Sequence, residues 1–233
     1  FGRDAWLYCY RRQHPPREPD QHDQRIVAGG GGIHWRDPDH EEGVRQGQLL
    51  GDLPFMVGAD SADVWARQYA FRFDATIGVP PDAFSETGQD WGLPVYRWDV
   101  IAEDDYEWIR QRARRSADLF RGFRIDHLVG LYRTYAIPTD GGERTFSPAD
   151  PAAQLAQGET LVKLFAEAGS RVIAEDLGTV PDFVRGSLAR MRVPGYRVLR
   201  WERDWQEPGH PFRDPATYPA TSVATTGTHD TDT

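Results

Sequence analysis

The sequence predicts an α/β fold, and two observations carry this prediction. Between residues 51 and 233, short apolar runs alternate with stretches whose apolar residues recur at steps of three and four, which is typical of strands and helices in turn. Aromatic residues make up 12% of the chain and charged residues 27%, which suits a globular protein. The length of 233 residues is sufficient for one sizeable core.

The expected strands are five apolar runs, at 53–57, 122–126, 171–176, 196–201 and 222–226. The expected helices cover 61–71, 103–120, a stretch around 161–165, and a segment that opens at Thr179 and Pro181. In the second helix, one apolar face is formed by Tyr106, Ile109, Ala113, Ala117 and Phe120. This succession of strand and helix predicts that the strands run parallel.

Residues 11–48 differ from the remainder of the chain. Only six of these 38 residues are apolar, and the segment is rich in Gln, His, Pro, Arg and Asp. The glycine run at 29–32 lacks the Lys and Ser/Thr of a phosphate-binding loop, so a plain loop is expected there. We therefore divide the chain into a loop-like or misread segment, 1–50, and a catalytic part, 51–233.

Charge and cysteine content exclude several classes of protein. The net charge of -9 and the pI near 5.2 argue against a nucleic acid or an anionic membrane as a partner. The sequence contains no apolar run of membrane-spanning length and no signal peptide, and the lone Cys9 fits a reducing cytoplasm. No His/Cys cluster and no calcium-binding loop of the EF-hand type is present, so neither a metal nor another cofactor is expected.

Three expected strands end in carboxylates: Asp126 after RGFRI, Glu175 after RVIA, and Asp230 after TTGTH. In a barrel of parallel strands, catalytic side chains gather at the carboxyl ends, and glycoside chemistry requires a pair of carboxylates. Arg124 precedes Asp126 by two residues and shares its face of the strand, where a cation stabilises an ionised carboxylate. The alternative for each acid alone is that it caps a helix or faces solvent.

Several long motifs resemble the 4-α-glucanotransferases of glycoside hydrolase family 77, the amylomaltase or disproportionating enzyme family. They are RIDHLVGLYRTYAIP (124–138), VIAEDLGTVPDFV (172–184), TGTHDTDT (226–233), GDLPFMVGADSADVWA (51–66) and GVPPDAFSETGQDWGLPVYRWD (78–99). They occur in the family's order from about Gly51 onward. The resemblance implies a (β/α)8 barrel, of which only the strands corresponding to the third through seventh are evident. It also implies a chain truncated at both ends and inactive by itself.

The resemblance assigns the catalytic roles residue by residue. Asp126 matches the nucleophile, Glu175 the general acid/base, and Asp230 the third carboxylate, which steadies the distorted sugar. Arg124 and His229 match groups that contact the reacting sugar and its neighbours. Like-charge repulsion from the other two carboxylates is expected to raise the pKa of Glu175.

The resemblance also implies substrate contacts outside the carboxylates. Asp52 matches a weaker substrate-side position, with a turn-capping role as the alternative. Trp91 lies in a segment that resembles the family's flexible loop over the glucan groove, where it either stacks on a sugar or packs half-buried. His127 and Asp176 are expected to be structural or orienting. Family loops often carry an aromatic residue where Ala83 stands, which removes one glucan contact.

The implied function is transfer of α-1,4-glucan segments between malto-oligosaccharides by a retaining double displacement, without a cofactor. Two alternatives remain open from the sequence: an α-glucan hydrolase of the same clan, and an inactive fragment. The sequence does not give an oligomeric state.

Overall fold

The computed structural model describes residues 50–81, 85–204 and 206–228, and the backbone of three short strands nearer the N-terminus. The chain divides into two compact units, Phe1–Gln48 and Leu49–Thr233. None of the helices in the described part is long and apolar enough to cross a membrane.

The first unit contains a three-stranded antiparallel sheet in the order β1-β2-β3. Its strands are β1 (Val27–Gly29), β2 (Gly32–Trp35) and β3 (Arg45–Gly47). The glycine run, which we expected to be a plain loop, instead ends β1 and begins β2, with Gly29 and Gly32 paired in register.

The second unit is built on a parallel sheet of five strands, each close to one of the expected apolar runs. They are β4 (Leu50–Leu53), β7 (Gly122–Ile125), β10 (Arg171–Ala174), β11 (Gly195–Val198) and β12 (Ser222–Thr225). The spatial order β12-β11-β10-β7-β4 follows the order along the chain. The first strand lies earlier than the expected 53–57 and shares only Leu53 with it, because Pro54 has no N–H with which to continue the ladder.

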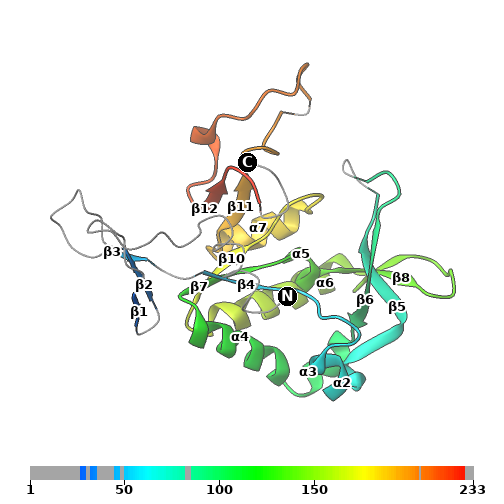
Figure 1. The fold of residues 1–233 in the computed structure, drawn as a ribbon. Coiled ribbons are helices and arrows are strands. Elements are labelled where there is room, and N and C mark those ends of the chain that lie inside the picture. The colour runs from blue at the N-terminus through cyan, green and yellow to red at the C-terminus, as the bar shows by residue number, and fades with distance from the viewer. Residues whose placement is uncertain are drawn as a thin grey trace, which may run out of the picture. The chain divides into compact units, whose positions relative to one another are not determined.

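Helices line one side of this sheet, as Figure 1 shows for α4 (Glu107–Leu119), α6 (Pro151–Ala166) and α7 (Asp182–Arg190). α6 begins where the Asp150 carboxylate accepts a hydrogen bond from the Ala153 N–H at 2.8 Å. On that side Phe123 of β7 meets Phe165 of α6 edge-on, with ring centroids 6.2 Å apart. Neighbouring strand residues alternate between faces, so Arg124 points away from these helices.

The expected helix at 103–120 corresponds to α4, which begins at Glu107, and a separate helix, α3 (Trp98–Glu103), ends where the expected one begins. Asp105 and Tyr106 between the two helices have φ angles of 56° and 58°. Left-handed backbone interrupts the helical hydrogen bonding. Ile109, Ala113 and Ala117 of the predicted apolar face therefore all lie in α4, and Tyr106 and Phe120 lie at its two ends.

The sequence did not reveal a second sheet, antiparallel and ordered β6-β5-β8-β9. Its strands are β5 (Phe71–Val79), β6 (Gln89–Tyr96), β8 (Thr134–Pro138) and β9 (Thr145–Ser147). The expected helix 61–71 shortens to α2 (Ala62–Ala66) and a 3-10 turn, η1 (Gln68–Ala70). Phe71 then starts β5, because its ring packs against Tyr96 and Trp108, with centroids 5.3 and 5.5 Å away.

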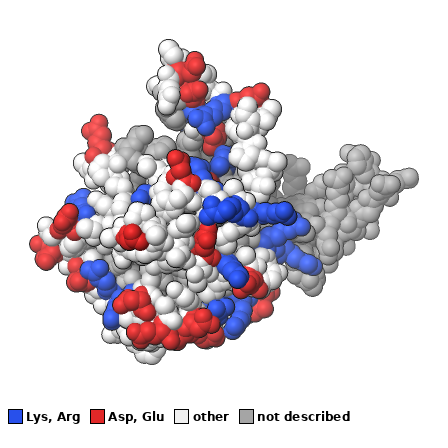
Figure 2. All heavy atoms as spheres, turned by 180° about the vertical axis from the view of Figure 1, so that it is seen from behind, with Lys and Arg blue, Asp and Glu red and all other residues white. Residues whose placement is uncertain are grey.

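Two short elements complete the described part, α5 (Val129–Tyr132) after β7 and η2 (Pro215–Thr217) before β12. Figure 2 shows the charges on one face, with acidic side chains gathered along the lower edge and basic ones across the middle. Charges of both signs are thus interspersed on this face, despite the net charge of -9.

Candidate active site

Arg124 joins the two carboxylates that flank it on the sheet. Arg124 and Asp52 are direct partners in the register of β7 and β4, so their side chains leave the same face. The guanidinium donates twice to Asp52, Nε to Oδ1 at 3.0 Å and Nη2 to Oδ2 at 2.9 Å. Nη2 also donates to Oδ1 of Asp126 at 2.7 Å. The structure therefore brings three of the predicted site residues into one ion-paired group.

Burial by itself would lower the pKa of the Arg124 guanidinium. The hydrogen bond to Asp52 and the charges of Asp52, Asp126 and Glu175 outweigh burial and raise that pKa above its ordinary value. Arg124 is thus a permanent cation at the base of the site. Only 17% of its side chain is exposed, against 47% for Asp126.

Glu175 follows β10 directly and is held by backbone groups. The Glu175 N–H donates to the Ile125 carbonyl at 3.1 Å, and the Leu128 N–H donates to the Glu175 carbonyl at 3.2 Å. The carboxylate accepts the His127 N–H at 2.7 Å and the Leu177 N–H at 3.2 Å. Glu175 is therefore fixed next to the turn that carries Asp126.

Burial is the main cause that raises the pKa of Glu175, and the charge of Asp126 raises it further. The hydrogen bond from the His127 N–H and the charge of Arg124 act in the opposite direction. We expected like-charge repulsion to be the leading cause. Removal of the Glu175 carboxyl group from water instead contributes more than the charge of Asp126.

Trp91 reaches this site from the antiparallel sheet. Its ring meets His127 edge-on, with centroids 4.8 Å apart, and its Nε1 donates to the Gln89 side chain at 3.0 Å. The ring of Phe55 lies 5.9 Å from that of His127. Burial lowers the pKa of His127 to about 4, so its imidazole is neutral at pH 7. His127 has a φ of 44°, which turns its N–H toward Glu175.

Sequence reasoning missed Tyr196 as a member of this group. Ala174 pairs with Gly195, so the residues that follow them are neighbours, with Glu175 just after the end of β10 and Tyr196 near the start of β11. The Tyr196 ring lies 5.9 Å from Arg124 Cζ, and its hydroxyl accepts a hydrogen bond from Thr225 Oγ1 at 3.3 Å. Alternation along YRVLRW is the signal that could have identified it.

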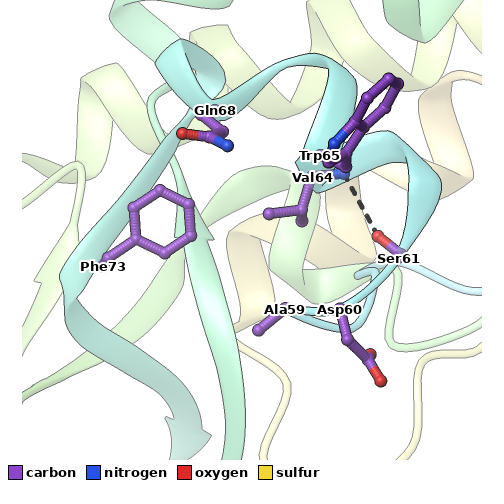
Figure 3. Close-up of a pocket in the computed structure, with 7 residues that line it drawn as sticks. All are labelled: Ala59, Asp60, Ser61, Val64, Trp65, Gln68 and Phe73. Carbon is purple, nitrogen blue, oxygen red and sulfur yellow. Dashed lines mark hydrogen bonds between the residues drawn. The ribbon is translucent and has the colours of Figure 1, made fainter.

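The remaining predicted residues, His229 and Asp230, lie outside the described residues, as does Ala83. A surface pocket of about 430 Å³ lies elsewhere in the second unit and contains none of the predicted site residues. Figure 3 shows Val64 pointing from α2 toward Phe73, with Gln68 on the same rim. The pocket and the carboxylate group thus share no lining residue.

These features define the class of α/β proteins that carry carboxylates at the carboxyl ends of neighbouring parallel strands, the arrangement on which glycoside chemistry depends. The sequence profile described as 4-alpha-glucanotransferase, glycoside hydrolase family 77, matches residues 35–233. The chain belongs to this family. The match starts at residue 35, ahead of Gly51, where the motifs quoted from the sequence begin.

Two relatives named 4-alpha-glucanotransferase illustrate the similarity. The protein from Chlamydia caviae is 37% identical over 186 residues, which are 79% of this chain and 35% of that protein. The protein from Thermus thermophilus is 38% identical over 200 residues, which are 80% of this chain and 38% of that protein. The chain thus spans about a third of the length of these relatives.

A solved structure agrees with this assignment. The amylomaltase from Streptococcus agalactiae, determined in complex with acarbose, superimposes with a TM-score of 0.66 and 31% identity. The superposition covers 79% of this chain and 38% of that one. The α/β fold predicted from the sequence is confirmed.

Proposed function

We propose that residues 1–233 belong to a 4-α-glucanotransferase that transfers α-1,4-glucan segments between malto-oligosaccharides. The observation that carries the proposal is the pair of carboxylates at the ends of β7 and β10, with Asp126 against a guanidinium and Glu175 partly buried with a raised pKa. Two carboxyl groups in contrasting environments can divide the roles of nucleophile and acid. Family membership supports the same reaction.

The five parallel strands are the third to seventh strands of a (β/α)8 barrel in this proposal. Strand order that follows chain order, with helices along one side, supports a barrel over a doubly wound sheet, whose order reverses at a switch point. The carboxyl ends of barrel strands carry the catalytic residues, and Asp126 and Glu175 lie at such ends. In this proposal residues 1–50 stay a segment apart from the catalytic part; the first compact unit of the structure is Phe1–Gln48.

In the first step, a carboxylate oxygen of Asp126 attacks the anomeric carbon of an α-1,4-glucan. The bond from that carbon to the glycosidic oxygen breaks, and Glu175 gives its proton to the departing 4-oxygen. The raised pKa of Glu175 favours the protonated form that this step requires. The products are a covalent glycosyl ester on Asp126 and a shorter glucan with a new 4-hydroxyl.

In the second step, the ionised Glu175 removes the proton from the 4-hydroxyl of another glucan. The oxygen of that glucan attacks the anomeric carbon and displaces Asp126, which restores both carboxyl groups. Two inversions give overall retention of configuration. The two N–H donors to Glu175 stabilise its carboxylate in the intermediate.

The other residues bind and orient the sugar in this scheme. Arg124 holds Asp126 and Asp52 in place, and Trp91 offers an aromatic face beside His127. His229 and Asp230 keep the sugar-side roles implied by the family resemblance. No cofactor enters the reaction, and a cytoplasmic location stays a prediction from the single cysteine.

The test uses a protein of the relatives' full length that contains these residues, here called the full-length protein. Asp126→Asn and Glu175→Gln should each lower disproportionation of maltotriose to glucose and maltopentaose by orders of magnitude, with unchanged circular dichroism. Near-normal turnover in either variant contradicts the assignment. Glucose without longer products in the unaltered protein favours the hydrolase alternative.

A further inference from the structure

The parallel ladder between β10 and β11 is much shorter than the others in the sheet. These strands share one paired position, Ala174 with Gly195, whereas β10 pairs with β7 at four positions. β11 likewise pairs with β12 at four. The strands β10 and β11 therefore separate at the point where Glu175 follows Ala174.

The side chain of Asp176 bridges this opening. Its Oδ1 accepts the Tyr196 N–H at 2.8 Å, a bond that takes the place of a ladder hydrogen bond between the two strands. A Cβ added to Gly195 would lie 2.8 Å from the same oxygen, so only glycine leaves room for the carboxylate. Asp176 is 3% exposed. The Asp176 carboxylate therefore fills the space between β10 and β11 that Gly195 leaves open.

Two arginines compensate the charge of Asp176. Arg197 Nη1 lies 2.9 and 3.2 Å from the two carboxylate oxygens, and Arg185 Nη1 of α7 lies 2.9 Å from Oδ2. A buried carboxylate is tolerated only with such partners. The three residues form what we call the Asp176 clamp, which links β10, β11 and α7.

The Asp176 clamp completes the support of Glu175. On the side of β7, backbone hydrogen bonds from Glu175 to Ile125 and from Leu128 to Glu175 fix the strand end. On the side of β11, the ladder stops at Ala174, and the contact after it is the Asp176 carboxylate. Movement of Asp176 therefore shifts Glu175 relative to the sugar-facing edge.

We propose that Asp176, together with Arg185 and Arg197, is a positioning residue that holds Glu175 in its catalytic placement. The inference rests on the proposed function of Glu175. Preorganisation to about 0.5 Å is what such sites require, and a strand end free on one side lacks it. Asp176 itself acts through Glu175 and does not reach the substrate.

Asp176→Asn in the full-length protein tests the clamp, because it keeps the shape and removes the charge. We expect kcat for maltotriose to fall about tenfold or more, with KM within about twofold, since the placement of the acid matters most in the transition state. The unpaired arginines should also stabilise the ionised form of Glu175. Its pKa then falls, and the alkaline limb of the kcat profile moves to lower pH.

The pKa of Glu175 also depends on the charged and titratable groups that face it from the neighbouring elements. From the side of β7 they are Asp126, which raises the pKa of Glu175, and Arg124, which lowers it. The imidazole of His127, whose backbone N–H donates to Glu175, is neutral at pH 7. A change in the alkaline limb on substitution of Asp176 alone therefore reports the clamp.

Arg185→Gln supplies the opposite perturbation, and we expect the fold to be retained, because the Arg185 side chain is 40% exposed and Arg197 still pairs with Asp176. Removing this cation should move the alkaline limb to higher pH, with a smaller loss of kcat. Glu167→Gln is the matched control, because its carboxylate pairs with Lys163 of α6 at 3.7 Å in an exposed ion pair that contains none of the clamp residues, and kcat should stay within about twofold.

The proposal is overturned if both variants, Asp176→Asn and Arg185→Gln, keep kcat within twofold of the unaltered protein. It is also overturned if the alkaline limbs of their kcat profiles do not move in opposite directions. A 13C NMR titration of Glu175 in the same variants gives the direction of the pKa shift without requiring turnover. If the unaltered protein transfers no glucan, the proposed function fails, and the titration alone decides whether the clamp controls Glu175.

Discussion

Replacing Arg124 by lysine separates the charge of this residue from its geometry. The guanidinium makes three hydrogen bonds, two to Asp52 and one of 2.7 Å to Asp126. A lysine retains the charge but presents a single nitrogen, which cannot reproduce the planar fork that engages both carboxylates. We expect Arg124→Lys to keep one contact to Asp52 and to lose the hold on Asp126.

A hydrogen bond to a charged group contributes about 1.5–3 kcal/mol, so loss of the contact to Asp126 predicts a decrease in kcat/KM of roughly 10- to 150-fold. Asp126 is 47% exposed, and water can replace part of the lost interaction. The lower end of the range, about tenfold, is therefore the expected value.

The assay is the initial rate of glucose release from maltotriose by the full-length protein. Arg72→Lys is the matched control, because Arg72 makes the same two-bond contact, at 3.0 and 3.1 Å, to Asp74 on the surface. Its kcat/KM should not change. If Arg124→Lys folds normally and keeps kcat/KM within threefold, the guanidinium geometry does not orient Asp126.

Three further outcomes are expected. The raised pKa of Glu175 should keep this acid protonated at pH values above the ordinary range of a glutamate, so kcat should decline as pH rises through that raised pKa. An alkaline limb of the kcat profile that lies at or below the ordinary glutamate range contradicts this. Trp91→Ala should raise KM for maltotriose by roughly fivefold or more, at about 1 kcal/mol for a lost aromatic contact, and an unchanged KM makes the ring a packing residue. Gly158→Ala should destabilise by about 1–3 kcal/mol, because its Cβ would lie 2.0 Å from Tyr132 Cδ1, while Gly186→Ala in α7 should be neutral or stabilising in thermal unfolding.

The parallel strands were predictable because each is a short apolar run whose residues enter one core. Phe123, Ile125, Val172 and Ala174 are all buried on the helix side of the sheet. The antiparallel sheet was not predictable in the same way. Phe71 continues the apolar spacing of the helix before it, and its partners Tyr96 and Trp108 are distant in the sequence.

In the site, too, contacts between residues close in the sequence could be predicted, and contacts between distant residues could not. Arg124 and Asp126 lie two residues apart on one strand, so alternation alone places them on one face. The contact of Arg124 with Asp52 spans 72 residues and depends on the register of β4 against β7. Asp176 was expected to be structural because it follows Glu175 on the opposite side, but its two arginines become visible only once β11 and α7 are placed.

The contrast between Asp126 and Glu175 is what assigns their roles. Asp126 receives a hydrogen bond from a full positive charge, the guanidinium of Arg124, which favours an ionised carboxylate ready to attack. Among the described residues, the hydrogen bonds of the Glu175 carboxylate come from two backbone N–H groups, which balance part of the desolvation and supply no formal charge. If the two roles were exchanged, Glu175, the more buried carboxyl group, would have to stay ionised, and Asp126, beside the guanidinium, would have to keep its proton. The environment of each residue opposes this. The nucleophile is therefore Asp126 and the proton donor Glu175 in the proposed reaction, and the order of the two chemical steps follows from that difference.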